Sequence, residues 1–434
     1  MKQLWIEFKQ RSWWRKSLNI VELLFAMAGF VIIGAWASYE LGLWKDSGVV
    51  DPNMGRQMEV SHVDINNAKL TQQQMDAAWA EHYGQLAALA RYYPANARLI
   101  LNAAQQSNNP LLVDRMIKAL EIYMTENQEL DNLSNSITQI LGRVPQQQRG
   151  NVIPWMNGPE WPVLKEAILR DSALIKEAGR LTGVEPRLIV GCLVGEQIRL
   201  FNSKREMYKK YLGPVKVLSV QSQFSYGVNG IKEFTAKAVE EHLQDPSSPY
   251  YMGPAYEHLL DFTTTDHTTE RYNRLVDYRN HLYSFIYTGC ILHQTMLQWR
   301  RAGYDISDRP ELLFTLFNVG FSQSVPKPDP KAGGSHIEVD GQTYTFGGIG
   351  FDFYYSGELA DVFPFQSERF SSNSKELTED DVEQIQKNMS DCARPERGLE
   401  YKKDSSAKAT TVTEEPDPFG IDHETTRSIE HTAQ

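Results

Sequence analysis

A carboxyl group at the end of an apolar stretch is the residue best suited to acid–base chemistry in this chain. Residues 184–197 read VEPRLIVGCLVGEQ, and Pro186 is typical of the first turn of a helix. The following residues are almost wholly apolar, so we expect a buried helix with Glu196 near its C-terminal end. Burial disfavours the ionised form of a carboxyl group and raises its pKa. Glu196 is therefore the candidate general acid.

Two further segments carry groups that can hold a sugar. Residues 222–232 read SQFSYGVNGIK, and their two glycines predict a tight turn or a short hairpin that feeds a helix. Such a turn lets backbone groups approach a ligand closely. Residues 312–320 read LLFTLFNVG, an apolar helix that ends in Asn318 and Gly320. An Asn at that point can hydrogen-bond the acetamido or hydroxyl group of a ligand.

The order of these three segments resembles that of the lysozyme-like lytic transglycosylases of bacterial cell walls. In that family a helix ending in E-S-x-F precedes G-x-x-G-[LI]-[MQ] and then A-Y-N-x-G. Glu196 matches the catalytic acid, while Gly227 and Gly230-Ile231 match the glycine-rich turn. Residues 317–320 (FNVG) match the last motif, with Phe in place of Tyr. The resemblance covers roughly residues 180–325, under half of the chain.

The resemblance implies cleavage of the β-1,4 bond between N-acetylmuramic acid and N-acetylglucosamine. Glu196 would protonate the leaving oxygen, and the muramic acid 6-hydroxyl would close on the anomeric carbon to give a 1,6-anhydro product. Standard glycosidases use a second carboxylate, but this family manages with one acid. The family pattern also implies a set of substrate-binding residues. These are Gln197, Ser225, Tyr226, Gly227, Asn229, Gly230, Phe317 and Asn318.

The departures from the family pattern support an alternative from another functional class. Gln197, Arg199, Lys232 and Phe317 replace the usual Ser, Phe, Gln and Tyr. The changes at Gln197, Lys232 and Phe317 favour a lysozyme-like domain that has lost catalysis and serves as a wall-binding or scaffolding subunit of an envelope complex. In that case Glu196 is a structural residue paired with Arg199. A sensor is a third alternative, which the short cytoplasmic segment counts against.

Some polar groups remain open to more than one interpretation. Asp352 lies within an aromatic run and Glu358 lies three residues after it, and they would be the second-carboxylate candidates of a hydrolase. The aromatic run itself, residues 351–355, is more typical of a core than of a sugar platform. His281 and His293 lack metal-ligand spacing and no HExxH occurs, so we expect no metal and no cofactor.

The longest apolar run, residues 18–39, predicts a transmembrane helix. A helix needs about 20 residues to cross a hydrocarbon core. Basic residues precede the run and mixed charges follow it, which predicts a cytoplasmic N-terminus and a body in the periplasm or extracytoplasmic space. A cleaved signal peptide would have a shorter core and a small-x-small cleavage site, whereas bulky residues follow this run.

Composition limits the partners and the redox chemistry. The chain has 434 residues and a net charge of −11, which argues against a nucleic-acid partner. The resemblance implies peptidoglycan strands and an envelope protein complex as partners, and the predicted anchor implies the membrane. The chain has 3 cysteines and no CxxC. Cys192 and Cys290 lie in apolar helical stretches, where they are either buried thiols or one disulfide.

The expected fold is mainly α, with a lysozyme-like α+β domain that contains a small β-hairpin. The hairpin strands would be residues 336–339 and 342–346, joined by Asp340-Gly341. Residues after 367 are poor in large apolar side chains, which predicts disorder. The expected parts are a cytoplasmic segment (1–17), an anchor (18–39), a linker (40–69), a helical module (70–150), the catalytic domain (151–367) and a disordered tail (368–434).

Overall fold

The computed structural model of this chain describes residues 48–61, 70–124, 149–202, 225–226 and 228–366, with short helical pieces between 21 and 34. The predicted cytoplasmic segment, most of the predicted anchor and the predicted tail lie outside these residues. Within the residues that are described, no helix combines the length and the apolar character that crossing a membrane requires. The anchor and the tail therefore stay predictions.

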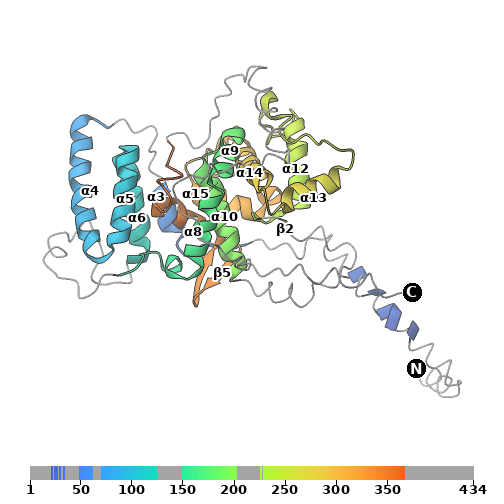
Figure 1. The fold of residues 1–434 in the computed structure, drawn as a ribbon, viewed down its shortest axis with the longest axis horizontal. Coiled ribbons are helices and arrows are strands. Elements are labelled where there is room, and N and C mark those ends of the chain that lie inside the picture. The colour runs from blue at the N-terminus through green and yellow to red at the C-terminus, as the bar shows by residue number, and fades with distance from the viewer. Residues whose placement is uncertain are drawn as a thin grey trace, which may run out of the picture. The chain divides into compact units, whose positions relative to one another are not determined.

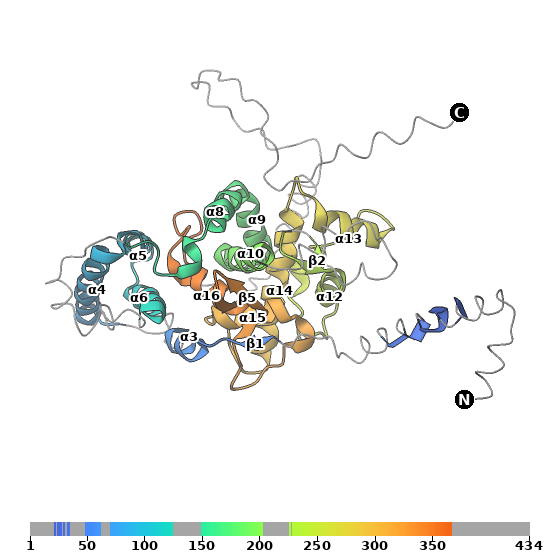
Figure 2. The same ribbon diagram turned by 90° about the horizontal axis from the view of Figure 1, so that it is seen from below.

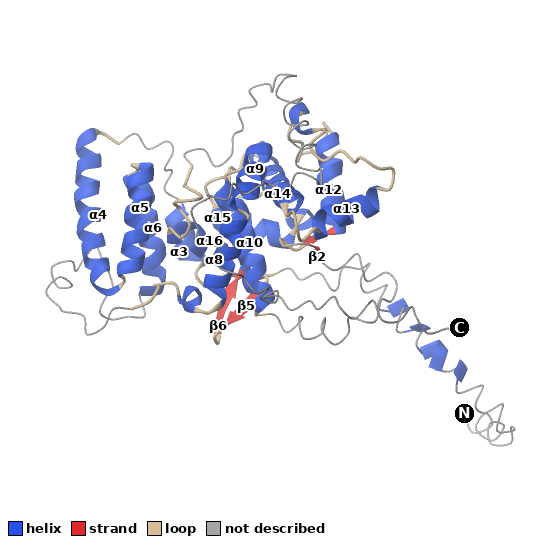
Figure 3. Cartoon of the chain, in the orientation of Figure 1, coloured by secondary structure: helices blue, strands red, loops and turns tan. Residues whose placement is uncertain are grey.

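The described part of the chain is mainly helical, as expected, and its short strands form antiparallel pairs (Figure 3). The helices are α3 Met54–Ser61, α4 Gln72–Tyr92, α5 Pro94–Ser107, α6 Pro110–Met124, η1 Pro154–Asn157, α8 Glu160–Arg170, α9 Ser172–Thr182, α10 Pro186–Phe201, α12 Glu233–Gln244, η3 Pro254–Tyr256, α13 His267–Val276, α14 Leu282–Arg301, α15 Pro310–Val319, η4 Phe321–Gln323 and α16 Phe346–Ser356. The strands are β1 Val49–Val50, β2 Ser225–Tyr226, β3 Ile231–Lys232, β4 Gly333–Gly334, β5 His336–Val339 and β6 Gln342–Thr345.

Helix α10 lies among α8, α9, α14, α15 and α16, and this group forms the core around the candidate acid (Figures 1 and 2). Pro186 starts α10, and nearly all of its residues are buried, as the apolar sequence predicts. The ring of Phe314, on α15, lies directly against the backbones of Gly191 on α10 and Gly350 on α16. A Cβ added at either glycine would lie 2.3 Å from that ring. The small residues therefore allow the three helices to approach closely.

Helices α10 and α16 run antiparallel, which fixes what lies at each end of α10. Near its C-terminal end, a Cβ added at Gly195 would lie 2.7 Å from the ring of Phe346. Near its N-terminal end, the buried Arg187 guanidinium donates to the carbonyl oxygens of Phe353 (2.9 Å) and Tyr354 (2.9 Å), in the last turn of α16. It also donates to the carbonyl oxygen of Glu358, at 2.8 Å.

The described part of the predicted helical module, residues 70–124, contains α4, α5 and α6, which lie side by side (Figure 2), whereas residues 125–148 lie outside the described residues. Thr71 caps α4 in a capping box with Gln74, and Pro94 starts α5. Helix α6 packs against α3 and α16. Arg115 of α6, which has no exposed surface, donates to the hydroxyl of Tyr355 at 3.2 Å. Buried contacts of this kind connect the module to the segment that carries the candidate site.

Part of the predicted linker, residues 48–61, is instead an integral part of the folded body. Strand β1 pairs with β4, and the Asp51 backbone N–H donates to the carbonyl oxygen of Ala332 at 2.9 Å. The hydroxyl of Ser61, in α3, donates to the buried carboxylate of Glu311 at 2.9 Å. These contacts show that the linker prediction is wrong for residues 48–61. The local sequence does not reveal them, because the partner residues lie more than 200 positions away.

The predicted hairpin is present. Strand β5 pairs with β6 in the register Val339 to Gln342, and the connecting residues Asp340 and Gly341 both have positive φ, at 49° and 78°. This is the turn that an Asp-Gly pair favours. Strand β6 ends at Thr345 rather than at Phe346, because Thr345 caps α16 and accepts the Gly348 N–H at 3.0 Å.

Cys192 and Cys290 are both buried free thiols. This resolves the alternative that the sequence left open, against a disulfide between them. Burial raises the pKa of both thiols well above the usual value, so both are neutral near pH 7.

Candidate functional site

Glu196 lies near the C-terminal end of α10, and 4% of its surface is exposed. Its carboxylate oxygen Oε2 accepts two N–H groups of Arg199, one turn further along the helix. The Nε atom lies at 3.1 Å, and Nη2 makes a shorter contact. Burial favours the neutral form of the carboxyl group, whereas the guanidinium favours the ionised form. The two hydrogen bonds show that the pairing of Glu196 with Arg199, which the sequence allowed, is present.

The predicted glycine-rich turn lies directly against this carboxyl group. Gly230 has a φ of +61°, and a Cβ added there would lie 2.7 Å from the carboxyl carbon of Glu196. The side-chain amide of Gln197 donates to the carbonyl oxygen of Val228 at 2.6 Å. Strands β2 and β3 frame the turn and lead into α12, as the sequence predicted. The fold thus brings Glu196, Gln197 and Gly230 together.

Asn229 lies in the same turn but faces the interior. It has no exposed surface, and its side-chain amide donates to the hydroxyl of Thr288 on α14 at 2.7 Å. The Thr288 hydroxyl in turn donates to the carbonyl oxygen of Ser284 at 2.9 Å. Asn229 therefore anchors the turn to α14 rather than facing a ligand. Gly227 lies outside the described residues, and Ser225 and Tyr226 contribute the β2 backbone.

The third predicted segment meets the site indirectly. The ring of Phe317, in the last turn of α15, lies 6.0 Å from the ring of Phe346 between centroids, and Phe346 contacts α10 at Gly195. Asn318 points to another neighbour. Its side-chain oxygen accepts the backbone N–H of Ser335 at 2.8 Å and the Ser335 hydroxyl at 2.9 Å. Phe317 thus packs near the ring that contacts α10 at Gly195, and Asn318 holds the segment that leads into β5.

The two carboxylates that a hydrolase would use have other partners. Asp352 is buried and accepts hydrogen bonds from the hydroxyl of Tyr123 (2.6 Å) and the indole of Trp155 (2.9 Å). Glu358 is paired with Lys165 at 2.7 Å. It lies beside Arg187, at the end of α10 opposite to Glu196. Asp352 connects α16 with α6 and η1, and Glu358 connects the segment after α16 with α8, so both carboxylates serve the fold.

The environment of Asp352 predicts a measurable pH dependence of stability. Burial raises its pKa to about 8, although its two hydrogen bonds act in the opposite direction. The folded chain therefore holds a proton that the unfolded chain releases near pH 4. We expect the free energy of unfolding to fall as the pH rises from about 4 to 8, by at most about 1.4 kcal/mol per pH unit from this group.

Asp352→Asn should remove this contribution, because an amide has no ionised form. The measurement is urea unfolding at several pH values for both chains, with the difference between the two profiles isolating Asp352. Parallel profiles would contradict the prediction.

Gly230→Ala should destabilise the chain more than an ordinary glycine substitution with positive φ. A left-handed residue with a side chain costs roughly 1–2 kcal/mol, and here the new methyl group would also displace the Glu196 carboxyl. Gly303→Ala is the matched control, because Gly303 also has a positive φ (+88°) but has no atom within 4 Å of an added Cβ. Urea unfolding of both variants gives the comparison. Equal losses would mean that Gly230 does not approach Glu196 closely in solution.

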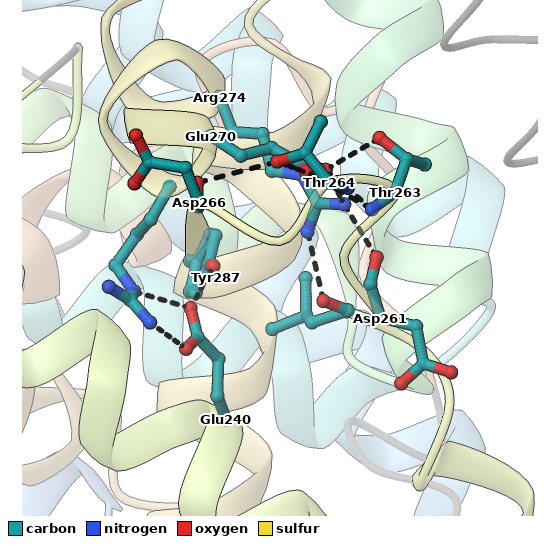
Figure 4. Close-up of polar contacts among 10 residues, drawn as sticks. Glu240, Asp261, Thr263, Thr264, Asp266, Glu270, Arg274 and Tyr287 are labelled. Atoms are coloured by element: carbon teal, nitrogen blue, oxygen red, sulfur yellow. Dashed lines mark hydrogen bonds and ion pairs between the residues drawn. The ribbon is translucent and has the colours of Figure 1, made fainter. Parts of the chain in front are cut away.

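A polar cluster that was not predicted from the sequence lies around α13 (Figure 4). Glu240 is held by both Arg271 (2.8 and 2.6 Å) and the hydroxyl of Tyr287. Glu270 accepts hydrogen bonds from Thr263 and Thr264 and pairs with Arg274 at 2.6 Å. These contacts outweigh the effect of burial and lower the pKa of Glu270 to about 2. These contacts fasten α13 to α12 and to the loop that precedes α13.

A surface cavity of about 990 Å³ lies at the N-terminal end of α10, away from Glu196. Its lining includes Lys176, Arg180, Pro186, Phe363 and Phe365. None of the predicted site residues belongs to it. Within the described residues, no group of three or more His, Cys, Asp or Glu side chains could hold a metal ion.

Comparison of the chain with models of known protein families, with curated proteins and with solved structures finds no significant match.

Proposed function

We propose that this chain is a membrane-anchored lytic transglycosylase with a lysozyme-like domain, which cuts peptidoglycan outside the cytoplasmic membrane. The observation that supports the proposal best is the contact between the buried Glu196 carboxyl group and the turn at Gly230. The two groups are 34 positions apart, yet they meet in the arrangement that the family pattern implies. Residues 18–39 would anchor the enzyme with its N-terminus in the cytoplasm.

The proposed reaction needs one acid and no water. Neutral Glu196 donates its proton to the glycosidic oxygen as the bond between that oxygen and the anomeric carbon of muramic acid breaks. The muramic acid 6-hydroxyl then forms a bond to the same carbon, and its proton passes to the Glu196 carboxylate. Glu196 ends the cycle as it began, neutral. The structural engagement of Asp352 and Glu358 agrees with a one-acid reaction.

A second candidate function is a lysozyme-like wall-binding or scaffolding subunit without catalysis. The pairing of Glu196 with Arg199 favours it, because an ionised carboxyl group cannot donate a proton. The engagement of Asn318 with Ser335 favours it as well, since that Asn would otherwise hold a sugar.

Digestion of purified sacculi by the full-length chain in detergent distinguishes these functions, with the products identified by mass spectrometry. Anhydro-muropeptides are the expected result. Products with reducing ends would replace the proposal by a hydrolase. Sacculus binding without any product would overturn the enzyme proposal in favour of the scaffolding subunit.

A further inference from the structure

We propose that β1 and the loop that leads into β4 form a lipid-binding surface, which lies on the outer face of the membrane that the predicted anchor crosses. This surface, called the β1 surface below, consists of Val49, Val50, Val325, Lys327 and Lys331. The inference rests on the membrane anchor of the proposed function, and it assigns the side of the folded body that faces the bilayer.

The valines of the β1 surface are open to solvent. Val49 and Val50 are 46% and 49% exposed, and Val325 is 61% exposed. Neighbouring side chains in a strand point to opposite faces, so packing on one face would cover one of the two strand valines. Both remain about half exposed here. Strand β1 therefore presents apolar side chains that the folded body does not cover.

The partner strand explains why these two side chains stay uncovered. Val49 pairs with Gly334 and Val50 pairs with Gly333, and a glycine offers no cross-strand side chain. A Cβ added at Gly333 would lie 1.8 Å from the carbonyl oxygen of Val49, so the close pairing requires glycine at that position. The way in which β1 packs on β4 therefore leaves the valines available to an external apolar phase.

The loop before β4 adds positive charge to this surface. Lys327 and Lys331 are both exposed, and the loop of residues 325–332 contains one acid, Asp329. Two lysines and one aspartate give the loop a charge of +1, whereas the whole chain carries −11. Lysine can lay its methylene stem on an apolar surface while its ammonium group reaches the phosphates of anionic lipids.

The position of β1 in the sequence selects the membrane as the partner. Only residues 40–47 separate the end of the predicted anchor from Gly48, where the folded body begins. A segment of that length spans at most about 30 Å when fully extended. The chain therefore holds β1 next to the bilayer, and exposed valines beside cationic side chains are the groups that the headgroup region accepts.

The first test measures the depth of Val50 in a bilayer. The full-length chain carries Cys392→Ser, so that only an introduced thiol reacts, because Cys192 and Cys290 have no exposed surface. Val50→Cys is labelled with an NBD fluorophore and reconstituted into vesicles of equal parts of phosphatidylcholine and phosphatidylglycerol. We expect spin-labelled lipids to quench this fluorophore at least about 2-fold more strongly than one at a position that faces water.

Val163→Cys provides that control position. Val163 is 48% exposed, which matches Val50, but it lies on α8, on the opposite side of the body from β1 (Figure 2). Equal quenching at the two positions would overturn the inference. Protection of Val50 from water that depends on protein concentration and occurs without lipid quenching would also overturn it, in favour of contact with a second copy of the chain.

The second test asks whether the β1 surface acts as one unit. The fluorophore is placed at Val325→Cys, and Val50→Asp is introduced into the same chain. A carboxylate on β1 should be repelled by an anionic bilayer, so we expect quenching at Val325 to fall by at least about half. Val163→Asp should leave it unchanged. Unchanged quenching in the Val50→Asp chain would overturn the inference, and thermal unfolding of both variants excludes loss of fold as the cause of any difference.

The lysines are tested in the same assay. Lys327→Gln combined with Lys331→Gln should weaken quenching at Val325 in the anionic vesicles and should change little in phosphatidylcholine alone, because only the anionic lipids attract the ammonium groups. An equal loss in both kinds of vesicle would contradict the role of charge in this surface.

Two further measurements separate this inference from the proposed function. Flotation of the chain with the vesicles reports on the anchor, and sacculus digestion reports on catalysis. A chain that floats and cuts sacculi, but whose Val50 position is not quenched, would overturn the inference alone. Quenching at Val50 in a chain without activity would overturn only the enzyme proposal. A chain that does not float would overturn the predicted anchor and this inference with it.

Discussion

Glu196→Gln should reduce the formation of anhydro-muropeptides by about 10²- to 10⁴-fold, the usual contribution of a general acid. Glutamine keeps the size of the side chain and its hydrogen-bonding oxygen, but it cannot donate a proton to the glycosidic oxygen. The measurement is the initial rate of product release from sacculi under conditions in which binding is saturated. Binding itself should change little, because the loss is confined to the chemical step.

The fold of this variant can be tested against a matched substitution. Glu196→Gln removes the carboxylate that pairs with Arg199, and Glu177→Gln removes the carboxylate that pairs with Arg180 on the exposed face of α9. Both variants should unfold cooperatively, and Glu177→Gln should keep full activity. A Glu196→Gln variant with wild-type rates would show that another group supplies the proton.

The positions of the helix and of the turn that form the site could be predicted from the sequence, because they depend on the path of the backbone. Pro186 and the apolar run predicted α10, and the two glycines predicted the turn that lies against Glu196. Side-chain directions could not be predicted. Asn229 occupies the expected position but points into the core, toward Thr288.

Asn318 shows the same limit for a second reason. A sequence motif gives the residue type, whereas the partner of its amide depends on which distant segment packs nearby. Here that segment is Ser335, which follows β4. The pairing of β1 with β4 was missed for the same reason, since strands of two residues have no periodicity to detect. Local patterns therefore predicted the helices and the hairpin, and long-range contacts decided the rest.

Arg187 is the strongest case of a long-range role that its local sequence does not reveal. It stands at the start of an apolar helix, yet its guanidinium donates to four carbonyl oxygens at and beyond the end of α16, including that of Phe363 at 3.4 Å. The rings of Phe353 and Phe365 lie 4.7 and 4.4 Å from its central carbon. Burial lowers its pKa to about 10, so it remains charged at neutral pH.

Arg187→Met should therefore lower the free energy of unfolding by about 3–5 kcal/mol, as measured by urea denaturation. Methionine fills much of the space, but it leaves buried carbonyl oxygens without donors, and each orphaned group costs about 1–3 kcal/mol. It also removes the positive charge at the C-terminal end of α16, where the helix dipole favours a cation.

Arg187→Lys separates the charge from the geometry. An ammonium group keeps the charge, but it cannot present the planar set of donors that reaches Phe353 and Glu358 at once. We expect it to recover only part of the loss. Full recovery would mean that charge alone holds α16, and a loss below about 1 kcal/mol in Arg187→Met would mean that water satisfies these carbonyl groups. Helix α10 carries Arg187 near one end and Glu196 near the other. The buried guanidinium of Arg187 therefore fixes the helix that holds the Glu196 carboxyl group against the turn at Gly230.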